Sequence, residues 1–188
     1  MNDLSAKLLV IFQNVNDWLK FAEAKNAVLL AFSGAGMTAA LTVLATAQNL
    51  PRSLQVGLIL TTVALNICTL VCGISFLPET NLEKLRWSRT KYSSKTSIQS
   101  TDNLYYFGDL RKYKKTELLD SLNAQYFNLK ITPPYSKECE DLAVQITINS
   151  EIAFVKYKLF TSALCILISA ILLVPASITF SLIFFRTI

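Results

Sequence analysis

Three long stretches without a charged residue constrain this chain more than any other feature. They cover residues 26–51, 53–78 and 159–185, and they are 26, 26 and 27 residues long. A helix needs only ~20 apolar residues to cross the ~30 Å hydrocarbon core of a bilayer. Buried helices of soluble proteins rarely stay free of charge for so long. We therefore predict an all-α membrane protein with three transmembrane helices, at about residues 27–48, 53–77 and 159–186.

The distribution of basic residues predicts the orientation of these helices. Sixteen lysines and arginines lie before the first span or between the second and the third, whereas only Arg52 and Arg186 lie on the other side. Because basic residues favour the cytoplasmic side, we expect a cytoplasmic N-terminus and a cytoplasmic region at residues 78–158. The basic residues of this region are interspersed with ten acidic ones, so we expect no nucleic-acid partner.

The segment before the first span has the pattern of an amphipathic helix. Its apolar residues recur at steps of three and four and would form one stripe: Leu4, Leu8, Ile11, Phe12, Val15, Leu19 and Ala22. The segment either lies on the membrane surface or continues into the first span. No glycine or proline interrupts it, which favours one long helix from about Asp3 to Gln48, with residues 1–25 on the cytoplasmic side.

The cytoplasmic region at residues 78–158 is predicted to be mainly helical and to sense a signal inside the cell. We expect a short helix at residues 81–92, a polar loop at residues 93–103 and a helix near Lys115–Phe127. Ser136 is suited to cap a last helix, which meets no glycine or proline before Pro175. Two of the three spans would thus extend as long helices into a cytoplasmic helical domain.

The composition excludes several kinds of active site. Without any histidine, the chain has no Ser/His/Asp triad, no Cys/His dyad and no histidine metal site. Its five glycines form no phosphate-binding loop. Three of the four cysteines fall inside predicted spans, so we expect no disulfide. We predict a protein that is not an enzyme and that uses neither a cofactor nor a metal ion.

A polar stripe runs along the second span. Its members recur at steps of seven, four, three and four: Gln55, Thr62, Asn66, Thr69 and Gly73. Polar groups inside a membrane avoid lipid and contact other helices or water. The stripe has two interpretations, which are packing within one protomer and a self-association face or water-lined pore.

Three short motifs occur in a fixed order along the chain. The first is Trp18, Ala22, Glu23 and Lys25 at the approach to the first span, and the second is "YYFGD", with Phe107, Gly108 and Asp109. The third is "QITINSEIAFVKYK", with its matching positions at Gln145, Ile146, Asn149, Ile152, Ala153 and Lys156. Together they resemble the transmembrane effector family of the Pycsar bacterial antiphage systems, although Glu23 stands where aspartate is usual.

The resemblance implies a function that hydropathy alone does not. It implies an effector in the bacterial inner membrane, with a periplasmic C-terminus, that responds to a cyclic pyrimidine mononucleotide. A partner cyclase would make this ligand, cyclic UMP or cyclic CMP, during phage infection. The effector would then disrupt the inner membrane and cause growth arrest or death, as in abortive infection. We also expect contact with membrane lipid and assembly as a homo-oligomer.

The same motifs contain the groups that a cyclic nucleotide needs. The ligand requires a cation for its phosphate, an aromatic surface for its base, and amides or carboxylates for the base and ribose edges. The candidates are Lys25 and Lys156 for the phosphate, Trp18 and Phe107 for the base, and Asp109, Gln145 and Asn149 for the edges. Glu23 would pair with Lys156 or orient Lys25.

Each of these residues also has a purely structural interpretation. Tryptophan can anchor a helix at the membrane interface, lysine can set topology, and a glutamate beside a lysine can form a local ion pair. Two other functions also fit a three-span protein. One is a holin-like toxin that needs no ligand, and the other is a membrane adaptor that only recruits partners.

Overall fold

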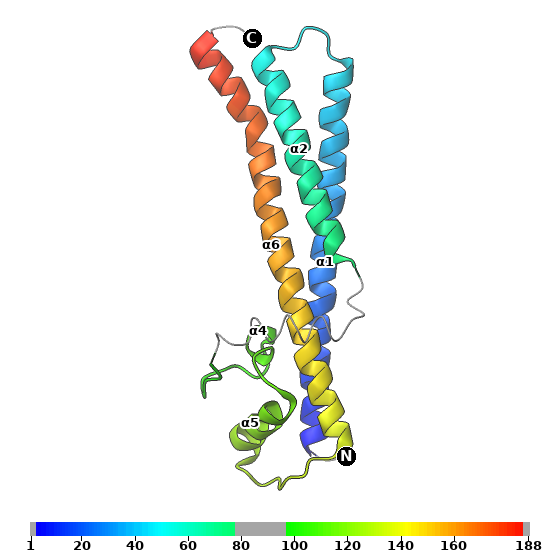
Figure 1. The fold of residues 1–188 in the computed structure, drawn as a ribbon, viewed down its shortest axis with the longest axis vertical. Helices are drawn as coiled ribbons and strands as arrows, with labels where there is room; N and C mark the ends of the chain where they lie inside the picture. Colours follow the sequence, from blue (N-terminus) through cyan, green and yellow to red (C-terminus); the bar gives the residue numbers. More distant parts are fainter. Residues whose placement is uncertain (1–2, 78–96, 186–188) are drawn as a thin grey trace. The chain divides into compact units, whose positions relative to one another are not determined.

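A computed structural model describes residues 3–77 and 97–185, and every regular element in these ranges is helical. The elements are α1 Asp3–Thr46, α2 Arg52–Ser75, α4 Phe107–Leu110, α5 Lys115–Phe127 and α6 Lys137–Phe185 (Figure 1). Three of them, α1, α2 and α6, are long and apolar enough to cross a membrane. The predicted all-α fold with three spans is confirmed. The helix predicted at residues 81–92 lies outside the described residues.

The chain divides into two compact units. The first, which we name the α4–α5 unit, consists of Met1–Ala22 and Pro78–Lys156, and the second, the membrane unit, consists of Glu23–Leu77 and Tyr157–Ile188. Helices α1 and α6 each contribute to both units without a break in the helix. The two long helices expected from the lack of glycine and proline are thus present.

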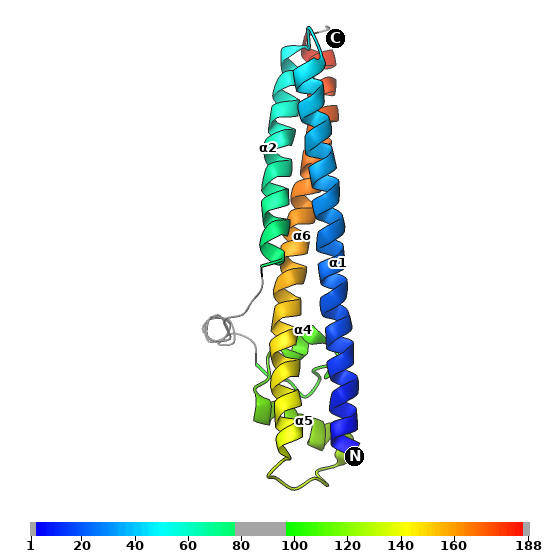
Figure 2. The ribbon, with the colours of Figure 1, turned by 90° about the vertical axis from the view of Figure 1, so that its right-hand side faces the viewer.

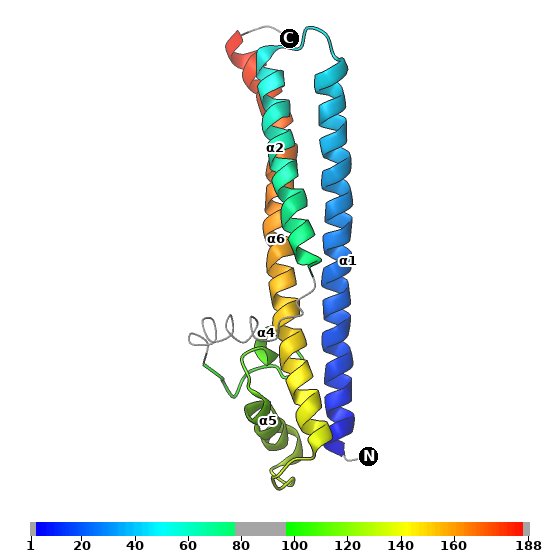
Figure 3. The ribbon, with the colours of Figure 1, turned by 45° about the vertical axis from the view of Figure 1, so that its right-hand side comes forward.

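The α4–α5 unit is built around the apolar stripe of α1. Leu8, Ile11 and Val15 are completely buried in a core to which α5 and α6 also contribute. Within this unit, α5 lies beside the first part of α6 (Figure 3). The core residues are Leu4, Leu8, Ile11, Val15, Leu104, Leu110, Tyr113, Leu118, Leu119, Leu122, Cys139, Ala143 and Ile146. This stripe packs inside the protein, and α1 runs unbroken from Asp3 to Thr46, which favours one long helix over a segment that lies on the membrane surface.

Local sequence signals explain where the helices of this unit begin. The side-chain oxygen of Ser136 accepts a hydrogen bond from the backbone N–H of Cys139 at 3.4 Å, as expected of a residue that caps α6. Helix α5 has the bounds expected from its apolar residues, and Leu118, Leu119 and Leu122 point into the core. It ends at Asn128, which adopts the left-handed conformation typical of a helix C-terminus.

In the membrane unit, the second part of α1, helix α2 and the last part of α6 run side by side (Figure 2). Helix α2 buries one face, which recurs at steps of three and four: Leu58, Thr61, Leu65, Cys68, Cys72 and Ser75. Gly57 lies close to α6, because a Cβ atom at this position would collide with the side chain of Ser177. The absence of a side chain thus allows these two helices to approach closely.

Candidate functional site

Two predicted ligand residues from distant parts of the chain meet in the α4–α5 unit. The ring of Trp18, on α1, lies 5.6 Å from the ring of Phe107, on α4, with a tilt of 52° between their planes. Tyr106 contacts the same phenylalanine at 4.7 Å. Phe107 is buried, whereas Trp18 and Tyr106 are 37% and 44% exposed. The cluster is therefore anchored on one side and accessible on the other, which suits stacking against a flat ligand.

The local structure explains why the "YYFGD" motif contains a glycine. Gly108 has no room for a Cβ atom, which would collide with the ring of Tyr106. The backbone N–H of Arg111 donates to the carbonyl of Phe107 at 3.2 Å, so α4 is a single tight turn. This turn places Phe107 and Arg111 on the same side of α4.

Within the α4–α5 unit, a pair of amides joins helices α1 and α6. The Asn149 side chain donates to the side-chain oxygen of Asn16 at 2.8 Å. Asn14, two residues earlier, donates to the carbonyl of Tyr105 at 2.8 Å. Of the other predicted residues on α6, Gln145 is exposed and Lys156 is half-buried. The structure therefore uses Asn149 to hold two helices together.

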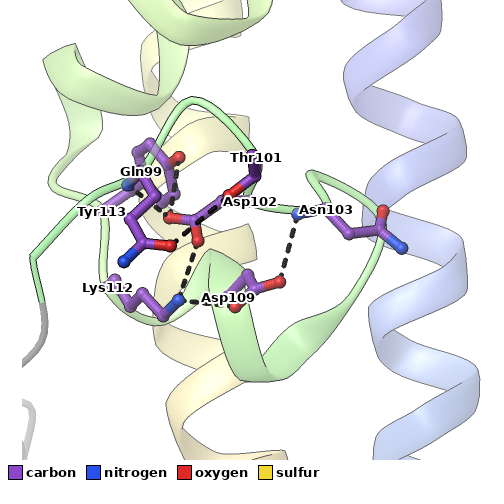
Figure 4. Close-up of polar contacts among 7 residues, drawn as sticks. All are labelled: Gln99, Thr101, Asp102, Asn103, Asp109, Lys112 and Tyr113. Carbon is purple, nitrogen blue, oxygen red and sulfur yellow. Dashed lines mark hydrogen bonds and ion pairs between the residues drawn. The ribbon is translucent and has the colours of Figure 1, made fainter.

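Asp109 belongs to a polar network that organises the loop before α4 (Figure 4). Its carboxylate lies 2.6 Å from the ammonium group of Lys112 and accepts a hydrogen bond from the backbone N–H of Asn103. Lys112 also contacts Asp102 at 2.9 Å. Asp102 in turn accepts hydrogen bonds from the backbone of Gln99 and the phenol of Tyr113. The Asp109 carboxylate, which we predicted to contact the base or ribose, thus already pairs with Lys112.

The network shifts the pKa values of its members. Burial opposes ionisation of Asp102, but hydrogen bonds from Lys112 and the Gln99 backbone, with the lysine charge, lower its pKa below the usual 3.8. Hydrogen bonds to Asp102 and Asp109 raise the pKa of Lys112 above the usual 10.5. Burial, together with the Asp102 charge, raises the pKa of Tyr113 to about 12. The three groups therefore keep their charge states throughout the physiological range.

The lowered pKa of Asp102 predicts a stability loss in acid. A carboxyl whose pKa is lower in the folded than in the unfolded protein stabilises the fold above the unfolded value. This contribution is lost as the pH falls below 3.8 and through the folded value. We expect the thermal midpoint of the full-length protein in detergent to fall more steeply between about pH 4 and 2 than that of Asp102→Asn. Parallel pH profiles of the two proteins would contradict this role of Asp102.

The sequence motifs did not point to one charged cluster of the α4–α5 unit. The guanidinium carbon of Arg111 lies 3.6 Å from the centre of the Phe154 ring, and its Nη1 atom lies 3.6 Å from a carboxylate oxygen of Glu151. The Arg111 and Glu151 side chains are only 16% and 8% exposed. One signal was available, because Glu151 and Phe154 lie within the third motif and share a face of α6.

The two remaining predicted ligand residues, Glu23 and Lys25, belong to the membrane unit. The Lys25 ammonium group lies over the rings of Tyr157 and Phe160, at 5.4 and 5.3 Å from their centres. Such contacts stabilise a cation beside an apolar helix bundle. Glu23 is half-buried. Its pairing with Lys156 would join the two units and stays a prediction.

The polar stripe of α2 lies beside the buried face of this helix. Thr69 donates to the side chain of Ser33 on α1 at 3.0 Å, and Thr62 donates to its own helix backbone. Gln55 and Asn66 are exposed. The one contact of the Asn66 amide nitrogen within the described chain is the sulfur of Met37 at 3.9 Å. Two amides of the stripe are therefore available on the outer surface of the membrane unit.

Together, the α4–α5 unit offers the chemistry of a small-anion site. Trp18 and Tyr106 provide aromatic surface, Arg111 provides a cation, and Glu151 provides an acceptor. Trp18 lies on α1 and Glu151 on α6, and Tyr106 and Arg111 flank α4 at its two ends. The core of the unit holds these segments together. They suit the non-covalent binding of a flat, negatively charged molecule.

Comparison with known proteins identifies the family of this chain. The Pycsar effector protein domain matches residues 7–183, which is most of the chain. The Pycsar effector protein RsPycTM of a Rhizobium species is 31% identical over 165 residues, which are 85% of this chain and 86% of the relative. No solved structure matches the chain. The resemblance inferred from the three motifs is thereby confirmed, and the chain belongs to the Pycsar effector family of antiphage membrane effectors.

Proposed function

We propose that this protein senses a cyclic pyrimidine mononucleotide on the cytoplasmic side and then disrupts the integrity of the inner membrane. The ligand is cyclic UMP or cyclic CMP made by a partner cyclase, and the result is growth arrest or death of the infected cell. The excess of basic residues in residues 1–25 and 78–158 supports a cytoplasmic sensing region. The action requires binding and membrane disruption but no catalytic step.

One observation carries this proposal. The Pycsar effector domain matches residues 7–183, so it includes both the aromatic and charged groups of the α4–α5 unit and all three apolar helices. A family domain that contains both parts supports a function in which one part recognises a signal and the other acts on lipid. A domain that only senses a ligand, or one that only anchors a protein in the membrane, does not account for a family match that covers both parts.

The long helices offer a route by which ligand binding would affect the membrane. Trp18 and Asn16 lie on α1, and Glu151 and Phe154 lie on α6. Each of these helices continues into the membrane unit. A ligand that moves the first part of either helix would bias the spans that follow, provided that it binds one arrangement better than the other. We expect a homo-oligomer in the disrupted membrane, in which polar groups of the α2 stripe contact a neighbouring copy or water.

The test is nucleotide-triggered depolarisation. The full-length protein is reconstituted into liposomes that carry a potassium diffusion potential and a voltage-sensitive dye, with insertion verified by flotation. We expect cyclic UMP or cyclic CMP to collapse the potential, and protein-free liposomes to be unaffected by either. Failure of both nucleotides with inserted protein would contradict the proposal.

The same assay separates the two alternative functions. A holin-like toxin would depolarise the liposomes before any nucleotide is added. A membrane adaptor would bind its partners but leave the potential unchanged with or without nucleotide. Only the proposed effector requires both the inserted protein and the ligand.

A further inference from the structure

Arg111 is held in the α4–α5 unit in an unusual way. Its side chain is 16% exposed, and the Phe154 ring covers one face of the guanidinium group at 3.6 Å. The Nη1 atom lies 3.6 Å from Oε2 of Glu151. This distance permits electrostatic attraction but is too long for a hydrogen bond. Glu151 therefore fixes one end of the guanidinium group without satisfying its donors.

The donors of Arg111 are unused within the part of the chain that the structure describes. A guanidinium group has five N–H donors in a planar fork. The Nε atom is buried and has no hydrogen-bond partner there, and no side-chain hydrogen bond of Arg111 occurs among the described residues. Buried donors in folded proteins are nearly always paired. The arrangement is therefore suited to an acceptor from outside these residues.

The position of Glu151 shows which donors of Arg111 it leaves unpaired. The carboxylate lies at Nη1, whereas Nε and Nη2 form the adjacent edge of the guanidinium plane. An edge with two parallel N–H groups fits the two oxygens of a phosphate or carboxylate in a bidentate arrangement. Since Phe154 covers one face of the guanidinium group, an anion is best bound in its plane along this edge.

We propose that the Nε–Nη2 edge of Arg111 binds the phosphodiester of the cyclic mononucleotide. This inference rests on the proposed function for the identity of the ligand. A cyclic phosphodiester carries one negative charge and two exocyclic oxygens, which match the two donors of this edge. Glu151 acts as a positioning residue at the opposite end of the guanidinium group.

The neighbouring groups are consistent with the rest of such a ligand. Phe107 precedes Arg111 by one helical turn and contacts Trp18, so an aromatic surface lies on the same side of α4. The competing cations have other roles. Lys112 is held by two carboxylates, and Lys25 lies over two aromatic rings of α6. Arg111 is thus a better candidate for the phosphate contact than Lys112 or Lys25, whereas the contact expected at Lys156 stays a prediction.

The experiment compares charged and neutral forms of the ligand. Dissociation constants are measured for the full-length protein in nanodiscs with cyclic UMP, cyclic CMP and their methyl phosphotriesters, which lack the negative charge. Since hydrogen bonds to charged groups are strong, we expect wild type to prefer the charged form by at least ~10-fold. In Arg111→Gln this preference should largely disappear, because the charged form weakens while the triester changes less than about twofold.

Two further variants make the result decisive. Arg111→Lys keeps the charge but loses the bidentate edge, so the preference should fall at least about threefold even if Arg111→Gln does not fold. Lys130→Gln removes an exposed positive charge from the same unit and should leave the preference unchanged. An unchanged preference in a folded Arg111 variant would overturn this inference alone. If the wild-type protein bound neither nucleotide, both this inference and the proposed function would be wrong.

Discussion

Lys112→Met should destabilise the α4–α5 unit by about 3 kcal/mol, the typical cost of removing one partner from a buried ion pair. The Lys112 side chain is 13% exposed and contacts Asp102 and Asp109 at 2.9 and 2.6 Å. Without it, the Asp102 carboxylate, which is 4% exposed, would have no cation in the network. The measurement is urea-dependent hydrogen exchange of the amides in residues 99–113, with full-length protein in detergent.

The control is a lysine in the same unit with a similar but exposed ion pair. Lys20 lies 3.7 Å from Asp17, and both side chains are about three-quarters exposed. Lys20→Met should change stability by less than ~1 kcal/mol, because exposed pairs contribute little. In Lys112→Met, the second change Asp102→Asn should recover part of the loss, since it removes the unpaired charge. Equal effects of Lys112→Met and Lys20→Met would show that the network does not stabilise the unit.

The sequence predicts the long elements of this fold because each depends on a local property. An uncharged run of about 26 residues specifies a membrane helix wherever its neighbours lie. The spacing of Leu118, Leu119 and Leu122 specifies the inner face of α5 without information about its partners. The absence of glycine and proline before Pro175 explains why α6 passes from one unit to the other. Such signals require no knowledge of tertiary contacts.

The candidate site is less predictable, because its residues meet only through tertiary packing. Trp18 and Phe107 were identified separately, and their contact follows from the way α1 and α4 pack. Asp109 carries a carboxylate that could contact a ligand, but in the folded unit this carboxylate pairs with Lys112. Arg111 and Glu151 are 40 positions apart, and neither belongs to a local pattern that indicates an ion pair. Their juxtaposition becomes visible only in the folded unit.

In the membrane unit, the contacts of the polar stripe of α2 are also not predictable from the sequence. The seven- and four-residue steps identify one face of the helix, but they do not show which neighbour that face meets. Thr69 donates to Ser33 on α1. Asn66, the next polar residue along the stripe, is exposed, and its amide nitrogen meets only the weakly accepting sulfur of Met37 on α1 among the described residues. An exposed amide in hydrocarbon is unfavourable, since lipid offers no hydrogen-bond partner. Its amide can both donate and accept, so a second copy of the chain or water would satisfy it.

Asn66→Leu should therefore remove most of the nucleotide-triggered depolarisation while leaving nucleotide binding unchanged. Leucine is similar in volume but cannot pair with an amide or line a water-filled path, so we expect the initial rate to fall by at least ~10-fold. The matched control is Ile67→Leu, at the next position, where one exposed apolar side chain replaces another. Rates are measured in liposomes at saturating nucleotide and normalised to inserted protein. If Asn66→Leu responds as strongly as Ile67→Leu, the amide is not part of the membrane lesion, and the disruption must use another face of the bundle.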